Sequence, residues 1–255
     1  MTSILLARTG HVTTLTLNRP EKRNALNVAL LEELCTAITD AERDASQRVL
    51  VLRGAGTVFC SGLDLAEAAE PGGADRSAAL IDRALRSLGL TRLVTIAAVH
   101  GAAIAGGAGV MSACDFAFAT RDAKFGYPEV RRGLVPALIM TFLRRQLRER
   151  DARELLLLGK LFNAEHARDI GLLTRVVADE TALETEVRTT ISSLLQGGPE
   201  SLAETKKLLR ELWPNPLERD LDSAHAYHLS ARTTAEAREG VAAFNEKRPP
   251  NWAPK

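Results

Sequence analysis

The chain has 255 residues, 45% of them hydrophobic, which is enough apolar material for one large domain or for one domain with a small appendage. Its 33 Lys and Arg nearly balance 32 Asp and Glu, and aromatic residues make up only 4%, so the composition gives no sign of a nucleic-acid-binding protein. It shows no signal peptide and no run of roughly 20 apolar residues that could cross a membrane, and its cysteines (Cys35, Cys60 and Cys114) are widely spaced without a CxxC motif; we therefore expect a cytoplasmic protein without disulfides, metal or a membrane partner.

The first half of the chain alternates between strand-like and helix-like segments. β-Branched alternation or short apolar runs predict strands at 12–17, 48–52, 93–99 and 115–119. Apolar residues at helical spacing predict helices over 27–43, capped by Asn27, and over 77–88. Strands joined by helices of this length imply βαβ crossovers and a largely parallel sheet, so the fold class is α/β. Residues 70–75, Glu-Pro-Gly-Gly-Ala-Asp, predict a mobile loop.

After Pro136 the pattern becomes helical almost throughout. The helices predicted there span 137–147, 150–158, 164–170, 180–195, 199–212, 217–232 and 234–247. One short strand is expected at 174–177, and Gly197–Pro199 and Trp213–Pro216 read as turns. We interpret 1–195 as an α/β core and 196–255 as a helical C-terminal region that packs on another surface, such as a neighbouring subunit.

Two glycine-bearing turns follow predicted strands, at Phe59–Leu65 and at His100–Gly109. A strand–turn–helix transition leaves free backbone N–H groups, and two such turns side by side can direct two donors at one oxygen. The alternative is that both are ordinary turns. A dinucleotide-binding fingerprint fits poorly, because the third glycine is missing and a strand at Asp115 follows too soon.

These turns, together with three other motifs, resemble the crotonase superfamily, the enoyl-CoA hydratase/isomerase family. The five motifs, in family order and spacing, are Asn18–Leu26, Phe59–Leu65, the glycine run ending at Asp115, Phe125–Glu129 and Ala243–Arg248. The resemblance implies a crotonase (ClpP/crotonase-like) fold of repeated ββα units with a C-terminal helical trimerisation region. It also implies a homotrimer or a dimer of trimers that acts on an acyl-CoA thioester, with no cofactor beyond the coenzyme A of the substrate.

The resemblance also assigns site residues. Glu129 takes the position of a catalytic glutamate, and the N–H groups of Ser61 and Gly106 would form the oxyanion hole. The expected substrate and CoA contacts are Lys22, Arg23, Ala25, Gly62, Leu63, Asp64, Phe244 and Lys247, the last two often acting from another subunit. Without the resemblance, Lys22 and Arg23 read as a solvated turn, Phe244 as a core aromatic and Glu129 as an acidic residue at a helix start.

The chain departs from the family pattern at the second acid/base position. Family hydratases carry another glutamate where this chain has Gly109, one type of family isomerase has an aspartate where it has Ala137, and a glycine cluster is replaced by Pro136–Met140. Hydration shares its proton transfers between two glutamates, whereas moving a double bond from C3 to C2 needs one base. The residues therefore favour Δ3-Δ2 enoyl-CoA isomerisation, with enoyl-CoA hydration or non-catalytic acyl-CoA binding as alternatives. Burial beside an apolar substrate predicts a raised pKa for Glu129.

For some other side chains near these motifs, the sequence leaves two alternative roles open. His100 either makes a structural hydrogen bond or reaches the site. Arg131 and Arg132 either face solvent or recognise an acidic acyl chain. Tyr127 and Tyr227 cannot be placed from the sequence, and the five histidines show no metal-ligand spacing.

Overall fold

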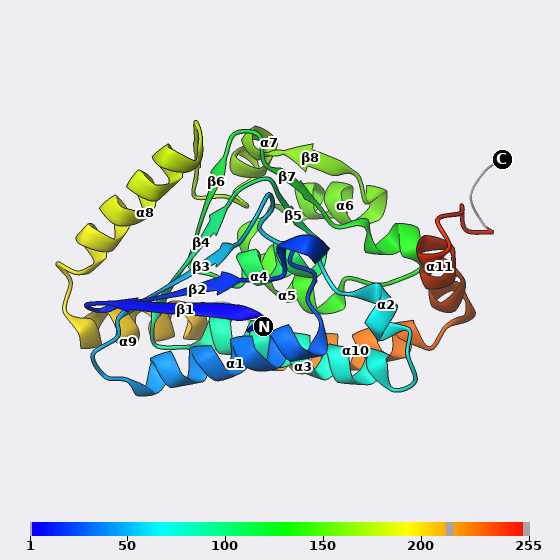
Figure 1. Ribbon diagram of the computed structural model, residues 1–255, viewed down its shortest axis with the longest axis horizontal. Coiled ribbons are helices and arrows are strands. Elements are labelled where there is room, and N and C mark those ends of the chain that lie inside the picture. Colours follow the sequence, from blue (N-terminus) through cyan, green and yellow to red (C-terminus); the bar gives the residue numbers. More distant parts are fainter. Residues whose placement is uncertain (1, 213–216, 252–255) are drawn as a thin grey trace.

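The computed structural model describes residues 2–212 and 217–251 and centres on a six-stranded sheet (Figure 1). The strand order is β1-β2-β3-β4-β6-β9, with β1 antiparallel to β2 and all other neighbours parallel. The strands are β1 (Ile4–Thr9), β2 (Val12–Leu17), β3 (Val49–Gly54), β4 (Val94–Val99), β6 (Phe116–Thr120) and β9 (Arg175–Val177). All five strands predicted from the sequence are present and lie side by side, which confirms the parallel sheet.

A second, three-stranded sheet was not predicted. It has the order β5-β7-β8 and consists of β5 (Ala102–Ile104), β7 (Lys124–Gly126) and β8 (Leu161–Asn163). The segment around Cys60 runs along β5: the Cys60 N–H donates to the Ala102 carbonyl oxygen and the Ile104 N–H to the Cys60 carbonyl oxygen, both at 3.0 Å. This pairing places the two glycine-bearing turns next to each other.

The helices begin and end near the predicted positions. They are α1 (Val28–Arg43), α2 (Leu65–Ala68), α3 (Gly73–Leu90), α4 (Gly106–Ser112), α5 (Ala137–Gln146), α6 (Glu149–Leu158), α7 (Ala164–Asp169), α8 (Glu180–Leu194), α9 (Pro199–Glu211), α10 (Leu217–Arg232) and α11 (Ala235–Asn245), with 3-10 turns η1 (Pro20–Lys22) and η2 (Pro128–Arg132).

The loop prediction for 70–75 is wrong for its second half. Gly73 is buried and begins α3, and Gly72 precedes it with φ 72°, a conformation that glycine adopts without strain. The turn predicted at Trp213–Pro216 lies outside the described residues.

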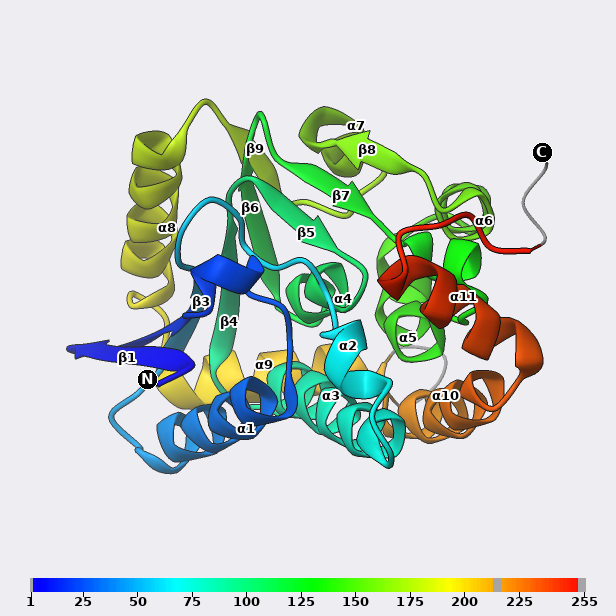
Figure 2. The same cartoon turned by 45° about the vertical axis from the view of Figure 1, so that its right-hand side comes forward.

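Both faces of the large sheet are covered (Figure 2). Leu50 and Leu52 of β3 point into the main core under α1 and α3, while Val49 and Val51 point the other way, toward α8. A parallel strand buried on both faces reads as a continuous apolar run, which is why β3 and β4 lack polar alternation.

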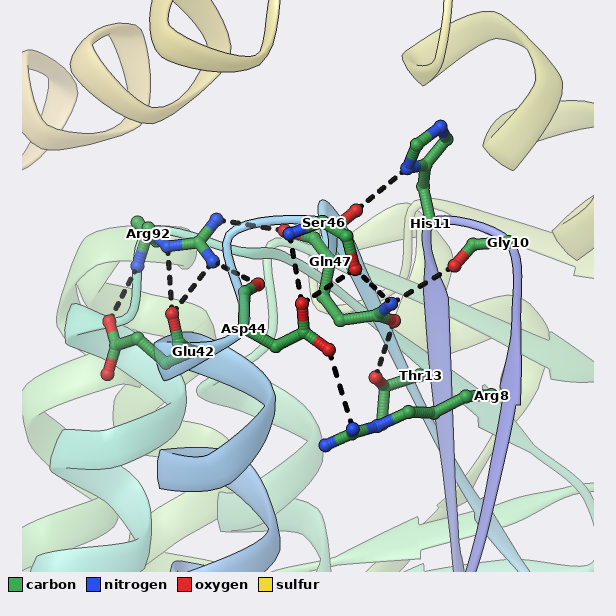
Figure 3. Close-up of polar contacts among 9 residues, drawn as sticks. All are labelled: Arg8, Gly10, His11, Thr13, Glu42, Asp44, Ser46, Gln47 and Arg92. Atoms are coloured by element: carbon green, nitrogen blue, oxygen red, sulfur yellow. Dashed lines mark hydrogen bonds and ion pairs between the residues drawn. The ribbon is translucent and has the colours of Figure 1, made fainter.

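Arg92, between α3 and β4, forms hydrogen bonds with the backbone at the C-terminal end of α1 (Figure 3). Its guanidinium donates to the carbonyl oxygens of Glu42, Asp44 and Gln47 at 2.7 to 3.0 Å. Glu42 lies in the last turn of α1 and Asp44 is its C-cap, where the helix cannot pair its own carbonyl groups, so a cation there both satisfies them and complements the helix dipole.

The C-terminal helices pack along the core. On α9, the buried Lys206 Nζ lies 2.6 Å from Asp115 Oδ2 and 2.7 Å from the Leu93 carbonyl oxygen. Contacts also join α10 to α5 and α3, and α11 to η2. A division at residue 195 and a role of 196–255 in oligomerisation stay predictions. In the described part of the chain, no helix combines the length and apolar character needed to cross a membrane.

Candidate active site

The two turns direct two unpaired backbone N–H groups toward the same space. Gly62 has φ 100°, and Ala105 has φ 50° and ψ −123°, a strained conformation for a residue with a Cβ. Each of these residues sets the direction of the amide that follows it, Leu63 N–H and Gly106 N–H. A Cβ placed on Gly106 would lie 3.6 Å from Leu63 N, so the two amides are close. Within the described residues, neither N–H donates a hydrogen bond.

This pair corrects the assignment of one oxyanion-hole donor. The Ser61 N–H donates to the Arg23 carbonyl oxygen at 3.0 Å, so it is not available to a substrate. Leu26 N–H donates to the Gly62 carbonyl and Asp64 N–H to the Leu26 carbonyl, at 2.8 and 3.0 Å. In this bridge the intervening amide, that of Leu63, faces away from the partner segment. The available donors are therefore Leu63 and Gly106.

Glu129 is a buried carboxyl group at the same site. Pro128 begins η2, and the fixed φ of proline suits the first position of a helix, so Glu129 falls in its first turn. The side chain is 8% exposed, and Oε2 has no hydrogen-bond partner within the described residues. Burial raises the pKa of Glu129 to about 7, although its own backbone N–H and the Arg132 charge act in the opposite direction. This is the direction that the sequence predicted.

Glu129 and the two amides line one apolar cavity of about 80 Å³. The walls come from the turns, α2, α3, the segment after η2, α5, α10 and α11; its lining includes Leu63, Leu65, Ile81, Gly106, Glu129, Arg132, Leu134, Leu138, Ile139, His228, Arg232 and Phe244. A carbonyl oxygen placed near the amides would lie in a space that also contains a carboxyl group with a pKa close to neutrality. That arrangement suits proton transfer next to a developing oxyanion.

Ile139 covers the position at which family hydratases carry their second glutamate. A Cβ added at Gly109 would lie 2.8 Å from Ile139 Cγ1, closer than Cβ atoms approach other groups, and 3.3 Å from Cδ1, a tight contact. The glycine of α4 and the isoleucine of α5 therefore fit each other, so the departures from the family pattern at Gly109 and at Pro136–Met140 pack together. Ala137, at the position of the isomerase aspartate, is buried and does not line the cavity.

A larger groove of about 600 Å³ adjoins the cavity. It shares Ser61, Leu63, Leu65, Arg132 and Phe244 with the cavity. Of the residues expected to contact coenzyme A, the structure places Lys22, Arg23, Ala25, Leu63, Asp64 and Phe244 on this groove. Gly62 shapes the turn beneath it, whereas Lys247 is exposed and lines neither the groove nor the cavity.

Arg19 is a supporting residue that sequence reasoning missed. Its guanidinium lies 3.2 Å from Asp64 Oδ2 and donates to the Ala25 carbonyl oxygen at 2.6 Å. It therefore ties the Asn18–Leu26 motif to the Phe59–Leu65 turn. The presence of Arg19 in one motif and Asp64 in the other could have indicated an ion pair between the two motifs.

Several other candidates have structural roles. His100 Nε2 lies 2.9 Å from the Gly56 carbonyl oxygen, in favour of the structural reading. Tyr127 is buried with its hydroxyl 3.3 Å from Ser112 Oγ, and Tyr227 is 71% exposed; neither lines the cavity. Arg131 Nε donates to the Leu158 carbonyl oxygen. Between residues 2 and 251, apart from 213–216, no group of three or more His, Cys, Asp or Glu side chains is arranged to hold a metal ion.

The fold and the site define an α/β enzyme in which one buried carboxyl group and two residues with unpaired backbone N–H groups line the same cavity. Comparison with known proteins agrees with this class. Residues 7–255 match the family model described as Enoyl-CoA hydratase/isomerase. A Thermus thermophilus protein named "Putative enoyl-CoA hydratase" is 38% identical over 254 residues, covering 95% of this chain and 98% of its own length. Enoyl-CoA hydratase EchA19 of Mycobacterium tuberculosis is 33% identical, covering 97% and 95%.

A solved structure gives the same result. The crystal structure of an enoyl-CoA hydratase from Mycobacterium avium superposes with a TM-score of 0.85 at 35% identity, covering 99% of this chain and 100% of that chain. The chain therefore belongs to the enoyl-CoA hydratase/isomerase family and has the crotonase fold. It is an enzyme of that family, of the hydratase or isomerase type.

Proposed function

We propose that this enzyme catalyses Δ3-Δ2 isomerisation of an enoyl-CoA thioester, with Glu129 as its single acid/base group. The observation that carries the proposal is that Glu129 is the one carboxyl group among the described residues that line the cavity, while Ile139 packs against Gly109 at the position of the second glutamate. With one carboxyl group present, a reaction that needs one proton carrier fits the site best.

Each step uses a group described above. The thioester carbonyl oxygen accepts hydrogen bonds from the N–H groups of Leu63 and Gly106. The Glu129 carboxylate removes a proton from C2, and the negative charge of the resulting dienolate collects on the carbonyl oxygen. Glu129 then returns the proton to C4, and the double bond moves from C3 to C2. Removing one such donor from an enzyme typically costs roughly 2.7–4 kcal/mol of transition-state stabilisation.

The pKa of Glu129 suits both halves of this cycle. A carboxyl group with a pKa of about 7 is ionised in a large fraction of molecules at neutral pH and is still acidic enough to give the proton back. The buried carboxylate is also a stronger base than an exposed glutamate would be.

The groove beside the cavity fits the coenzyme A part of the substrate. Lys22 and Arg23 carry positive charge on its wall, where phosphates would lie, and Phe244 stands between the groove and the cavity. Assembly as a homotrimer or dimer of trimers, and a cytoplasmic location, belong to the same proposal and rest on the family resemblance.

Hydration of a 2-enoyl-CoA is the second candidate. The names of the relatives favour it, since the proteins compared above are called enoyl-CoA hydratases. It would require Glu129 both to deprotonate a water molecule and to supply a proton to C2, without a second carboxylate.

Product analysis distinguishes these functions. The enzyme is incubated with trans-3-hexenoyl-CoA or trans-2-hexenoyl-CoA, and products are identified by mass spectrometry and by chromatography against standards. Conversion of the 3-enoyl to the 2-enoyl thioester without a mass change, lost in Glu129→Gln, supports isomerisation. Efficient addition of water to the 2-enoyl thioester would replace the proposal by hydration. Tight binding without either reaction would indicate an acyl-CoA binding protein.

A further inference from the structure

The cavity that contains Glu129 is also lined by a half-buried cation that the reaction does not use. Arg232, the last residue of α10, lines the cavity. Its Nη1 atom lies 3.1 Å from His228 Nε2 and 3.5 Å from Ser77 Oγ. Burial lowers the pKa of this guanidinium below its usual value, which reflects the loss of water around the charge.

His228 holds the guanidinium in place as a neutral acceptor. Burial, together with the Arg232 charge, lowers the pKa of His228 to about 4, so the imidazole is uncharged at neutral pH. Its Nε2 can then accept a hydrogen bond from Nη1, which fixes one edge of the guanidinium. Nη1 also donates to Ser77 Oγ, while Nη2 and Nε have no hydrogen-bond partner among the described residues.

Arg232 forms no ion pair with a carboxylate among the described residues, in contrast to Arg86 and Arg145. Arg86 binds Asp82 and Asp222, and Arg145 binds Asp220, all within 3.0 Å. For Arg232, the charge of Asp75 acts on the guanidinium, but the two side chains form no ion pair. A partly buried cation without a counter-ion is unfavourable, and an incoming anion would offset that energy.

The position of Arg232 places it away from the coenzyme A end of the cavity. The cavity shares Leu63, Arg132 and Phe244 with the groove that fits coenzyme A. It shares Arg232 and Leu134 with a different hollow of about 320 Å³, walled by residues of α2, α3 and α11. Figure 2 shows α2, α3, α10 and α11 gathered in this part of the molecule. An acyl chain entering from the groove would pass Glu129 and direct its far end toward Arg232.

Arg132, the other arginine of the cavity, does not have this role. Its guanidinium stacks on the Phe244 ring at 4.3 Å, and its charge acts on Glu129. It also lines the coenzyme A groove. Arg132 therefore belongs to the reacting end.

We propose that Arg232, oriented by His228, binds a carboxylate at the far end of the acyl chain, so that the preferred substrates are CoA thioesters of dicarboxylic acids. This inference rests on the proposed function for the direction in which the acyl chain lies. A guanidinium presents paired N–H donors that match a carboxylate, and it does so here among apolar walls that would otherwise select a methyl end.

Binding of saturated thioesters tests the inference without requiring turnover. The affinity of the enzyme is measured by calorimetry for CoA thioesters of six, eight and ten carbons, each ending either in a methyl group or in a carboxylate. The wild-type enzyme is expected to prefer the carboxylate at one of these lengths by about tenfold or more. Arg232→Gln removes that preference and leaves the affinity for the methyl-ended thioesters within about twofold.

Two further variants separate charge from fold. Arg219→Gln, an exposed arginine on the same helix, is expected to keep the preference. Arg232→Lys keeps the positive charge but loses the paired N–H donors. This variant is therefore expected to retain only part of the preference for carboxylate-ended thioesters. A wild-type enzyme that shows no preference for the carboxylate at any length, or an Arg232→Gln variant that keeps it, would overturn the inference. The failure of enoyl-CoA turnover with preference intact would instead reject the proposed function alone.

Discussion

Replacing Glu129 by glutamine should stabilise the protein at alkaline pH while removing its activity. The folded state raises the pKa of this carboxyl group from 4.5 to about 7. Below pH 4.5 the group is protonated in both folded and unfolded chains and contributes no difference. Between pH 4.5 and 7 the folded state holds the proton more tightly, so the free energy of unfolding falls as pH rises, and the loss is complete above about pH 7.

The size of this effect follows from the shift. A pKa difference of one corresponds to about 1.4 kcal/mol, so the rise from 4.5 to about 7 predicts a loss of about 3 kcal/mol in the wild-type protein at pH 8. Glutamine has nearly the same shape and no charge, so Glu129→Gln should exceed the wild type in free energy of unfolding by up to that amount at pH 8. At pH 4.5 the two proteins should have similar stability.

Urea unfolding at several pH values measures the difference. The matched control is Glu154→Gln, which removes an exposed carboxylate of α6 and should change stability by less than about 0.5 kcal/mol at either pH. The reasoning is refuted if Glu129→Gln is no more stable than the wild type at pH 8. In the wild type, kcat/KM should rise with pH to a plateau above about pH 7, and the variant should lose at least about 100-fold in kcat.

Three further changes test the site and its support. Gly62→Ala places a Cβ on a backbone with φ 100° and 3.0 Å from the Ile104 carbonyl oxygen, which should displace the Leu63 amide. Steady-state kinetics should then show kcat lowered by roughly 10- to 100-fold with KM little changed. Gly109→Glu should destabilise the protein by about 1–3 kcal/mol through overpacking against Ile139. The double variant Gly109→Glu with Ile139→Ala should fold and gain hydratase activity in the product assay. If it gains none, the absence of a second carboxylate does not explain the expected lack of hydration. Lys206→Met leaves Asp115 without its ion-pair partner and should cost about 3 kcal/mol in urea unfolding; an unchanged midpoint would show that this pair does not support the core.

The large sheet could be predicted from the sequence because its central strands are buried on both faces and read as apolar runs. β1 was missed since only Ile4 of its six residues is buried, so an edge strand of this kind carries no alternation. The small sheet was missed for a different reason. Its strands have three residues each, and their pairing joins segments that are distant in sequence.

The position of the site could be predicted from motifs, but the directions of its groups could not. The motif containing Gly62 indicated an oxyanion-hole turn, yet which amide faces the cavity depends on the bridge between Leu26 and Leu63. The contribution of α10 also escaped prediction. Arg232 and His228 read as ordinary helix residues until packing of α10 against α5 and α3 brings them to the cavity.

The central claim is that one carboxyl group carries a proton from C2 to C4. The most direct test uses 3-hexenoyl-CoA in which both hydrogens on C2 are replaced by deuterium. The enzyme converts this substrate in ordinary water, and the product formed early in the reaction is analysed for deuterium at C4. A single carrier enclosed in a small apolar cavity predicts that a measurable fraction of product has deuterium at C4 in the wild type and that Glu129→Gln forms no product. Product that carries only solvent hydrogen at C4, or an active Glu129→Gln variant, would contradict the account.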